Sequence, residues 1–404
     1  MLQPIDLGLI LIAVLVFAAF SRRLEASVIT MPMVFVTFGW LIGLSGIELV
    51  PMGAEREIIH VIAEVTLALV LFSDASRVNF KFLEQNFTIP IRMLLIGMPL
   101  TIGFGTIVAY WVSPDQPWAF ALLVAAILTP TDAALGQAVV NNQRVPERLR
   151  EGINVESGLN DGLALPVVMV AAIAVVQLAG KSIEGAPDNL AMFALMQVVL
   201  GPIAGLFVGY VTARLLDVAV SNGFATTAYQ GIYFLCAAFL CAVFANMIGG
   251  NSLIAAFIGG LVFGATLKCS RQFITEFMES EGQILTMLTF LIFGAVMVPI
   301  GLSHATWKTF VLSVAFLTIV RMVPIWISLT GAGLNFEEKA FLGWFGPRGL
   351  ASILFALLIV ENYPVPGADE MLACVVLTVI MSIFAHGISA TPLSSRLTKN
   401  NSHP

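Results

Sequence analysis

Charged residues are scarce in this 404-residue chain: it has 25 Asp and Glu, 19 Lys and Arg, and four His. Charged residues make up 11% of the sequence, against roughly 25% in ordinary soluble proteins. Hydrophobic residues make up 58%. No polar stretch is long enough to form a separate soluble domain. We therefore expect a polytopic membrane protein in which residues 1–404 form a single membrane domain.

Cysteine is also scarce, and its spacing excludes the usual cysteine sites. None of the four cysteines forms a CxxC pair, and all fall within or beside apolar segments: Cys236, Cys241, Cys269 and Cys374. This pattern favours neither a disulfide framework nor a zinc or iron-sulfur site. The chain also lacks a nucleotide-binding motif. We therefore expect no cofactor, no ATP and no nucleic acid as a partner.

Apolar segments recur along the whole chain, and thirteen of them approach the roughly 20 residues that cross a bilayer as a helix. The first carries Asp6 in place of an early basic cluster and shows no cleavage site, so we expect a retained helix rather than a signal peptide. The shortest turn is Gly249-Gly250-Asn251. The predicted fold class is an all-α membrane protein with candidate spans at 5–21, 27–46, 57–75, 88–112, 117–140, 150–178, 190–215, 227–248, 251–268, 282–300, 305–330, 338–361 and 368–391.

Lys and Arg are distributed unevenly between alternate loops, and Arg321 and Arg348 lie inside spans. Because Lys and Arg accumulate on the cytoplasmic side, we expect an odd number of spans in a plasma or inner membrane, with the amino terminus outside and the carboxyl terminus cytoplasmic. The charged stretch 271–281 is expected to form a surface helix that links two bundles. The loops expected on the cytoplasmic side contain Arg22, Arg23, Arg77, Lys81, Arg92, Arg144, Arg148, Arg150, Arg214, Lys268, Arg271, Lys339, Arg396 and Lys399. The loops expected on the outer side contain only Arg56, Lys181 and Lys308.

Two spans are interrupted by residues that break helices. The fifth contains TPTD at residues 129–132, and the twelfth contains GPRG at residues 346–349. Proline removes an amide donor, and glycine lets the backbone leave helical geometry, so each stretch is expected to unwind. The two spans are seven apart and run in opposite directions, as in an inverted repeat with two discontinuous helices near the midplane. The freed backbone groups imply a polar or wet cavity.

Unwinding also exposes internal helix ends that carry partial charges. If the two interruptions cross, Asp132 could compensate the positive ends and Arg348 the negative ends. The alternative is that Pro130 and Pro347 merely kink packed helices, with Asp132 and Arg348 paired to each other. The sequence leaves both arrangements open.

The sixth span contains ESGLND, from Glu156 to Asp161. Helical spacing places Ser157 one turn from Asp161 and Glu156 one turn from Asn160, so several oxygen ligands face one volume. A charged side chain at the bilayer centre costs on the order of 3 kcal/mol even on a lenient scale. Three acids at this depth, counting Asp132, therefore indicate a functional site.

Arg321, in the eleventh span, is another cation inside the membrane and needs a carboxylate partner. Pairing it with Glu156 would leave Asp161 as the free acid. Hard oxygen ligands suit an alkali cation better than a soft transition metal. One acid that holds either a proton or a cation, but not both, is the minimum machinery for exchange.

At these residues the chain resembles the monovalent cation/proton antiporters, specifically the NhaP-type sodium/proton antiporters related to the animal sodium/proton exchangers. The resemblance covers nearly the whole chain and is carried by TPTD, ESGLND, Arg321 and GPRG. It implies an NhaA-like antiporter fold with two crossing discontinuous helices, and a homodimer. It also implies a mobile transport core at 88–178 and 305–391 and a scaffold and dimerisation bundle at 5–75 and 190–300.

The same resemblance implies a role for each residue of the site. Asp161 resembles the essential aspartate that binds the cation and the proton. Asn160 stands where electrogenic relatives have a second aspartate, which implies electroneutral exchange of one cation per proton. Arg321 resembles the partner of the glutamate, and Arg348 the arginine near the crossing helix ends. The other implied contributors to the monovalent cation site are Thr131, Asp132, Glu156 and Ser157.

The sequence departs from the family pattern in one place. It reads Thr131-Asp132-Ala133 where many relatives have a proline after the aspartate. The departure leaves the aspartate intact but leaves the geometry of the interruption, and the preference among Na⁺, Li⁺ and K⁺, open. The chain after Pro392 is short, so we expect the large regulatory domain of the animal exchangers to be absent.

The predicted function is secondary active antiport of a monovalent cation, Na⁺ first among them, against H⁺ by alternating access, in the service of pH homeostasis and without enzymatic activity. One alternative is a channel or a proton-coupled carrier for another small solute. A remote one is an intramembrane aspartyl protease built on Asp132 and Asp161, although this chain has GLND where that family has GxGD. A serine protease built on Ser157 and His386 lacks the GxSG context.

Three further ionisable residues inside spans receive structural interpretations. Glu64 is expected to face a cavity or a dimer contact. Asp74 is expected to form a cytoplasmic cap with Arg77. His386 is expected to be a packed residue with a satisfied hydrogen bond.

Overall fold

Helices form all the regular structure in the residues that the computed structural model describes, which are 4–25, 29–44, 55–78, 88–140, 142–183, 189–270 and 272–400. Two of the segments, η1 and η2, are single turns of π-helix. The elements are α1 (Pro4–Glu25), α2 (Met31–Leu44), α3 (Glu55–Ser76), α5 (Thr88–Arg92), η1 (Met93–Gly97), α6 (Met98–Val112), α7 (Trp118–Leu128), α8 (Ala133–Val140), α9 (Glu147–Leu178), α10 (Leu190–Ser221), α11 (Thr227–Met247), α12 (Ser252–Thr266), α13 (Gln272–Ile292), η2 (Phe293–Met297), α14 (Val298–Ser303), α15 (Trp307–Leu317), α16 (Ile319–Ser328), α17 (Phe336–Trp344), α18 (Leu350–Asn362) and α19 (Ala368–Asn400).

Each of the thirteen predicted spans coincides with one helix or with consecutive helical segments. Seven helices in the described part of the chain are long and apolar enough to cross a membrane, and shorter apolar helices accompany them. The short turn between the eighth and ninth spans forms as predicted. Asn251 is the last residue of this turn, and its side chain accepts hydrogen bonds of 3.0 Å from the backbone N–H groups of Leu253 and Ile254 in the first turn of α12.

Each of the two π-helical turns comes just before a proline, and the sequence does not predict either turn. η1 comes directly before Met98-Pro99, and η2 directly before Val298-Pro299. In η1 the Met98 N–H reaches back to the Met93 carbonyl, and in η2 the Val298 N–H reaches Phe293. Proline crowds the turn before it, and the wider π turn accommodates that crowding without ending the helix.

The helix that contains the tenth span begins earlier than the predicted span. Stretch 271–281 was expected to form a separate surface helix, but α13 runs from Gln272 to Ile292 and continues through η2 and α14 to Ser303. Residue 271 itself lies outside the described residues. No proline interrupts residues 272–297, so the charged stretch extends the transmembrane helix and does not precede it as an independent element.

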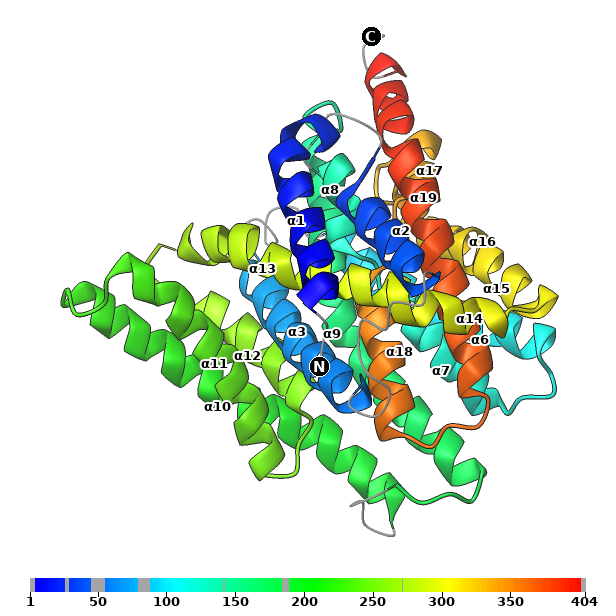
Figure 1. Ribbon diagram of the computed structural model, residues 1–404, viewed down its shortest axis with the longest axis horizontal. Coiled ribbons are helices and arrows are strands. Elements are labelled where there is room, and N and C mark those ends of the chain that lie inside the picture. Colours follow the sequence, from blue (N-terminus) through cyan, green and yellow to red (C-terminus); the bar gives the residue numbers. More distant parts are fainter. Residues whose placement is uncertain are drawn as a thin grey trace.

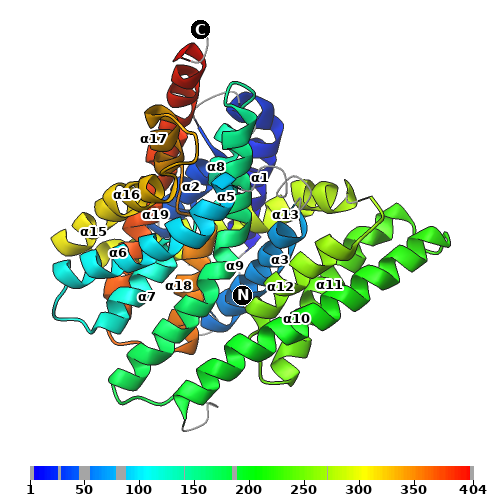
Figure 2. The ribbon, with the colours of Figure 1, turned by 180° about the vertical axis from the view of Figure 1, so that it is seen from behind.

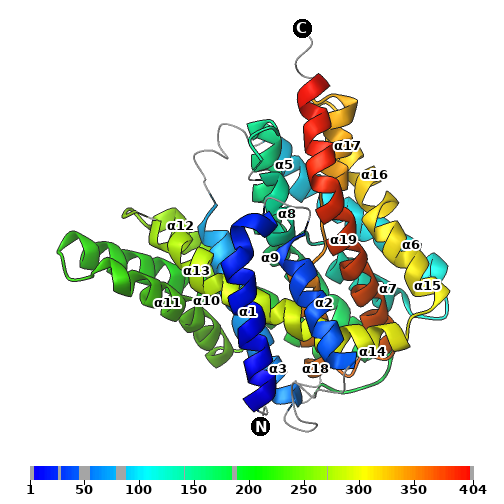
Figure 3. The ribbon, with the colours of Figure 1, turned by 45° about the horizontal axis from the view of Figure 1, so that its top comes forward.

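The helices form two groups with α9 between them. α3, α10, α11 and α12 pack against one another at one side of Figure 1. At the other side α6 packs against α7, α15 and α16, and α19 packs against α15 and α18. α9 contacts members of both groups, including α3, α12, α7 and α18, and its course between them is clear from behind in Figure 2. Figure 3 shows α13 and α14 crossing beneath α2. The division into a mobile core and a scaffold stays a prediction.

Close packing of α12 against α3 depends on two glycines. A Cβ atom built at Gly260 would overlap the backbone of Phe72, and one built at Gly264 would overlap the backbone of Ser76. Because only glycine lets the two backbones approach this closely, these positions set the spacing between α3 and α12. Asp74 lies on α3 between the two contacts, so this spacing also sets its position.

We predict that Gly260→Val lowers the free energy of unfolding by about 1–3 kcal/mol, because the added methyl groups must displace backbone. Thermal unfolding of the purified protein in detergent measures the loss. The control is Gly103→Val on α6, where nothing lies within 4 Å of the position of a Cβ atom. Equal melting temperatures for the two variants would contradict the packing argument.

Candidate functional site

The two interrupted helices meet at their interruptions. Residues 129–132 separate α7 from α8, and residues 345–349 separate α17 from α18. The Asp132 N–H donates to the Pro347 carbonyl over 2.8 Å, which joins the two non-helical segments through their backbones. The predicted crossing of two discontinuous helices is therefore confirmed. The alternative in which the prolines merely kink continuous helices is wrong, because neither segment is helical.

Asp132 caps two helices at once. Its Oδ1 accepts a hydrogen bond of 3.2 Å from the Leu135 N–H in the first turn of α8. Its Oδ2 accepts one of 2.5 Å from the Leu350 N–H, the first residue of α18. Helix amino termini carry partial positive charge and unsatisfied N–H groups. A single buried carboxylate therefore compensates the positive ends of both half-helices.

Arg348 serves the carboxyl end of α7, the helix that precedes the first interruption. Its Nη1 donates to the carbonyl of Thr129 over 2.5 Å and to that of Pro130 over 3.2 Å, at the carboxyl end of α7. The Arg348 side chain is fully buried, and its Nε and Nη2 atoms have no hydrogen-bond partner within the described ranges. The arginine thus places positive charge where the carbonyl end of α7 is partially negative.

Glu156 and Arg321 form a buried ion pair. Both Nη atoms of Arg321 donate to the Glu156 carboxylate, Nη2 to Oε2 over 2.7 Å and Nη1 to Oε1. Each side chain is 3% exposed. The pair links α9 to α16, and Arg321 also approaches the Leu342 carbonyl near the end of α17 at 3.4 Å. Each charge needs the other, because an unpaired charge at this depth is costly.

Three polar side chains tie α9 to the first interruption. The hydroxyl groups of Thr131 and Ser157 are hydrogen bonded at 2.9 Å. Asn160 Nδ2 donates to Thr131 Oγ1 over 2.6 Å. The Asn160 Oδ1 atom is buried and has no hydrogen-bond partner among the residues with described positions. Several oxygen atoms therefore face one small volume.

Asp161 lies one helical turn after Ser157 on α9 and is buried. Its Oδ1 atom has no hydrogen-bond partner in the described part of the structure. The charges of Asp74, Asp132 and Arg348 act on it. The structure thus gathers Asp161 with the other predicted site residues but gives this oxygen atom no protein partner.

Asp74 also belongs to this group of acids, although its place in the sequence predicts only a cap with Arg77. It lies on α3, and its charge interacts with Arg77, as expected for a cap, but also with Asp132 and Asp161. The sequence did carry a signal for Asp74, because an acidic residue inside a predicted span indicates a functional position by default. Glu64, on the same helix, accepts a hydrogen bond of 3.1 Å from Ser252 Oγ and so joins α3 to α12.

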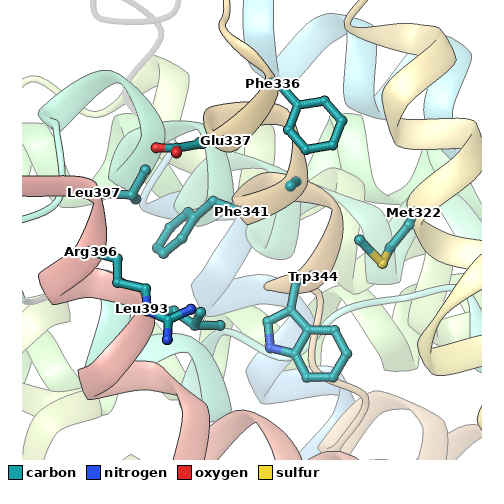
Figure 4. Close-up of a pocket in the computed structure, with 9 residues that line it drawn as sticks. Met322, Phe336, Glu337, Phe341, Trp344, Leu393, Arg396 and Leu397 are labelled. Carbon is teal, nitrogen blue, oxygen red and sulfur yellow. The ribbon is translucent and has the colours of Figure 1, made fainter. Parts of the chain in front are cut away.

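The ligands available at this site are oxygen atoms. Within the described residues, no group of three or more His, Cys, Asp and Glu side chains could hold a metal ion. Hydroxyl, amide and carboxylate oxygens suit alkali cations. A surface pocket of about 540 Å³ between α16, α17 and α19 contains none of the predicted site residues (Figure 4).

Sequence comparison agrees with this geometry. The family model described as "Sodium/hydrogen exchanger, transmembrane" matches residues 10–396. The chain belongs to the sodium/hydrogen exchanger family. The resemblance inferred from the motifs is confirmed, and the protein is a multi-pass integral membrane protein.

Relatives within the family carry the names of antiporters. The K(+)/H(+) antiporter NhaP2 of Shewanella baltica is 24% identical over 399 residues, which cover 97% of this chain and 66% of that protein. The Na(+)/H(+) antiporter 2 of Zygosaccharomyces rouxii is 24% identical over 396 residues, which cover 88% of this chain and 48% of that protein. The chain thus spans about two thirds of the length of the first and about half of the second.

The exchanger-family fold is also found in a solved structure. The sodium proton antiporter MjNhaP1 from Methanocaldococcus jannaschii, at pH 8, matches with a TM-score of 0.76 at 17% identity. The match covers 98% of this chain and 100% of that chain. The predicted antiporter fold is confirmed.

The ion pair between Glu156 and Arg321 predicts strong coupling in a double-mutant cycle. Arg321→Met or Glu156→Leu alone is expected to cost about 3–5 kcal/mol of stability, because each strands a buried charge. The double variant should lose much less than the sum of the two, since it strands neither. Thermal unfolding of the four proteins measures this, and additive losses would exclude the pairing.

Proposed function

We propose that this exchanger-family protein is a secondary active antiporter that exchanges a monovalent cation for H⁺ by alternating access. The observation that carries the proposal is the buried Asp161 carboxylate, which has an oxygen atom without a protein partner in the described structure. A buried carboxylate must be neutralised by a proton or by a cation. The antiporter names of the relatives support the same activity.

In this proposal Asp161 holds either the proton or the cation. When the proton leaves, the carboxylate and the free Oδ1 of Asn160 become ligands for a cation. The hydroxyl groups of Thr131 and Ser157, and the Asp132 carboxylate, contribute further oxygen atoms or orient those that bind. When a proton binds Asp161, the site loses the negative charge that holds the cation. Competition of this kind couples the two fluxes without ATP or a resident cofactor.

Three other buried charges, Glu156, Arg321 and Arg348, are engaged in structure and do not take part in the exchange. Glu156 is paired with Arg321, and Arg348 donates to the carbonyls at the end of α7. Asn160 is neutral, so the site gains one charge when it releases one proton. We therefore propose electroneutral exchange of one cation per proton. Relatives named for K⁺ and for Na⁺ leave the choice between these ions to experiment.

We further propose that α5–α9 and α15–α19 move as a transport core against a scaffold of α1–α3 and α10–α14. α9 contacts helices of both groups, so it lies where such motion would open and close access to Asp161. α10 and α11 expose apolar side chains, Leu206, Phe207 and Tyr229 among them, along faces available for a homodimer contact or for lipid. The uneven distribution of Lys and Arg supports an outside amino terminus and a cytoplasmic carboxyl terminus.

Asp161→Asn is expected to abolish exchange while leaving the fold intact, because asparagine has the same shape but neither charge nor a proton to exchange. Proteoliposomes with an internal pH dye measure proton movement when Na⁺, Li⁺ or K⁺ is added outside. Asp115→Asn is the control, since Asp115 is 82% exposed and paired with Lys308. Normal exchange by Asp161→Asn would overturn the assignment of the site.

Electroneutral exchange predicts that the rate of exchange does not respond to the membrane potential. The same proteoliposomes, with a potential imposed by a gradient of an ion that is not transported, measure the dependence directly. Asn160→Asp adds a second ionisable carboxylate at the site and is expected to make the flux sensitive to potential. A potential-driven flux in the unmodified protein would show that Asn160 does not determine the stoichiometry.

A further inference from the structure

The crossing of the two interrupted helices has four internal helix ends, and Asp132 and Arg348 account for three of them. Asp132 caps the amino ends of α8 and α18, and Arg348 serves the carboxyl end of α7. The remaining end is the carboxyl end of α17, at Trp344. Its last carbonyl groups already have donors: the Gly346 N–H donates to the Trp344 carbonyl over 2.8 Å, and Arg321 Nη2 approaches the Leu342 carbonyl at 3.4 Å. A carbonyl oxygen can accept two hydrogen bonds, so the Trp344 carbonyl can take a second donor.

His386 on α19 reaches this fourth end. Its Nε2 atom lies 2.9 Å from the Trp344 carbonyl oxygen, which is hydrogen-bond distance. The imidazole is 2% exposed and packs against the Trp344 indole with ring centroids 5.1 Å apart. The indole N–H in turn donates to Ser389 Oγ over 2.9 Å. Trp344 is thus held to α19 through both its backbone and its side chain.

The other side of the imidazole reaches the second interruption through Ser382. His386 Nδ1 lies 3.2 Å from Ser382 Oγ and 2.9 Å from the Ser382 carbonyl oxygen. Ser382 Oγ accepts a hydrogen bond of 2.6 Å from the Arg348 N–H. A neutral imidazole donates from one nitrogen only, and both nitrogens lie 2.9 Å from a carbonyl oxygen. We assign the hydrogen to Nε2, because Nδ1 has the Ser382 hydroxyl within reach as a donor, whereas Nε2 faces the Trp344 carbonyl. A chain of hydrogen bonds then runs from Arg348 N–H through Ser382 and His386 to the Trp344 carbonyl.

This series of hydrogen bonds spans the whole second interruption, residues 345–349. Trp344 is the last residue of α17, and Arg348 lies two residues before α18 begins at Leu350. Both are fastened to the same uninterrupted helix, α19, four residues apart at Ser382 and His386. The contacts therefore fix the length and the path of residues 345–349. The Arg348 guanidinium and the Leu350 N–H, which meet the first interruption, are positioned by that path.

We infer that His386, acting through Ser382, is a positioning residue for ion exchange that holds the second interruption in register with the first. The inference rests on the proposed role of Asp161, because its consequence for transport is the placement of Arg348 and Asp132 beside that carboxylate. His386 supplies a donor to a helix end without adding a third arginine beside Arg321 and Arg348.

The pocket beside Trp344 provides space into which the end of α17 can move when the contacts made by His386 and Ser382 are lost. Trp344 lines the pocket of about 540 Å³ together with Met322 and Phe341, and Figure 4 shows its indole at the edge of that space. Removing the imidazole takes away the ring that packs against the Trp344 indole and one of the two donors to the Trp344 carbonyl. The end of α17 can then shift toward the pocket and carry residues 345–349 with it.

The test compares His386→Leu, His386→Gln and Ser382→Ala in proteoliposomes, with the apparent KM for the transported cation and the maximal rate measured separately. His386→Leu and Ser382→Ala are each expected to raise the apparent KM by about 3- to 10-fold, the size expected from the loss of one buried hydrogen bond. His386→Gln keeps a side-chain N–H donor for the Trp344 carbonyl and should recover most of the loss. Ser382→Ala carries the test if His386→Leu does not fold.

The control is Thr378→Val, because the buried Thr378 hydroxyl on the same helix donates only to the Cys374 carbonyl of its own helix. It should leave the apparent KM unchanged. A role in stability alone would lower the amount of folded protein and the maximal rate without changing KM, and that outcome would overturn the inference. Unmodified protein that does not exchange cations for protons would instead overturn the proposed function.

Discussion

Two interrupted helices that cross within a membrane leave backbone groups without partners in their own helices. The rest of the structure depends on satisfying those groups. The Asp132 carboxylate accepts from the first turns of α8 and α18 at once, and the Arg348 guanidinium donates to the last carbonyls of α7. The Asp132 N–H and the Pro347 carbonyl join the two segments directly. Without these partners the interruptions would be costly in hydrocarbon, and a continuous helix would be favoured.

The same partners decide which buried charge remains available for function. Glu156 is neutralised by Arg321, and Asp132 and Arg348 are engaged by helix ends. Asp161 is left with an oxygen atom that no described residue satisfies. A site of this kind needs the surrounding charges to be immobile, because a free arginine would pair with the transport carboxylate. Structural compensation and ion binding are therefore two aspects of one arrangement.

The sequence predicted most of the fold and most of the site because both depend on local features of the sequence. Bilayer thickness sets the length of a span, so thirteen apolar segments could be counted, and proline and glycine mark where a helix unwinds. The π turns before Pro99 and Pro299 were missed, since a proline within a membrane helix is usually accommodated without a visible pattern. The extension of α13 was missed because charged residues were interpreted as the end of a span, although nothing there breaks the helix.

By itself the sequence determined the class of protein, the places where the two helices break, and the acids that the membrane would not tolerate without a function. Only the tertiary structure decided which groups meet: that one carboxylate caps two helices, that Asp74 comes near Asp161 from another part of the chain, and that His386 holds the end of α17. The physical reason is that hydrophobic length and helix breaking are local properties of the chain. Hydrogen bonding across more than 200 residues, as between Asp132 and Leu350, depends on how the helices cross.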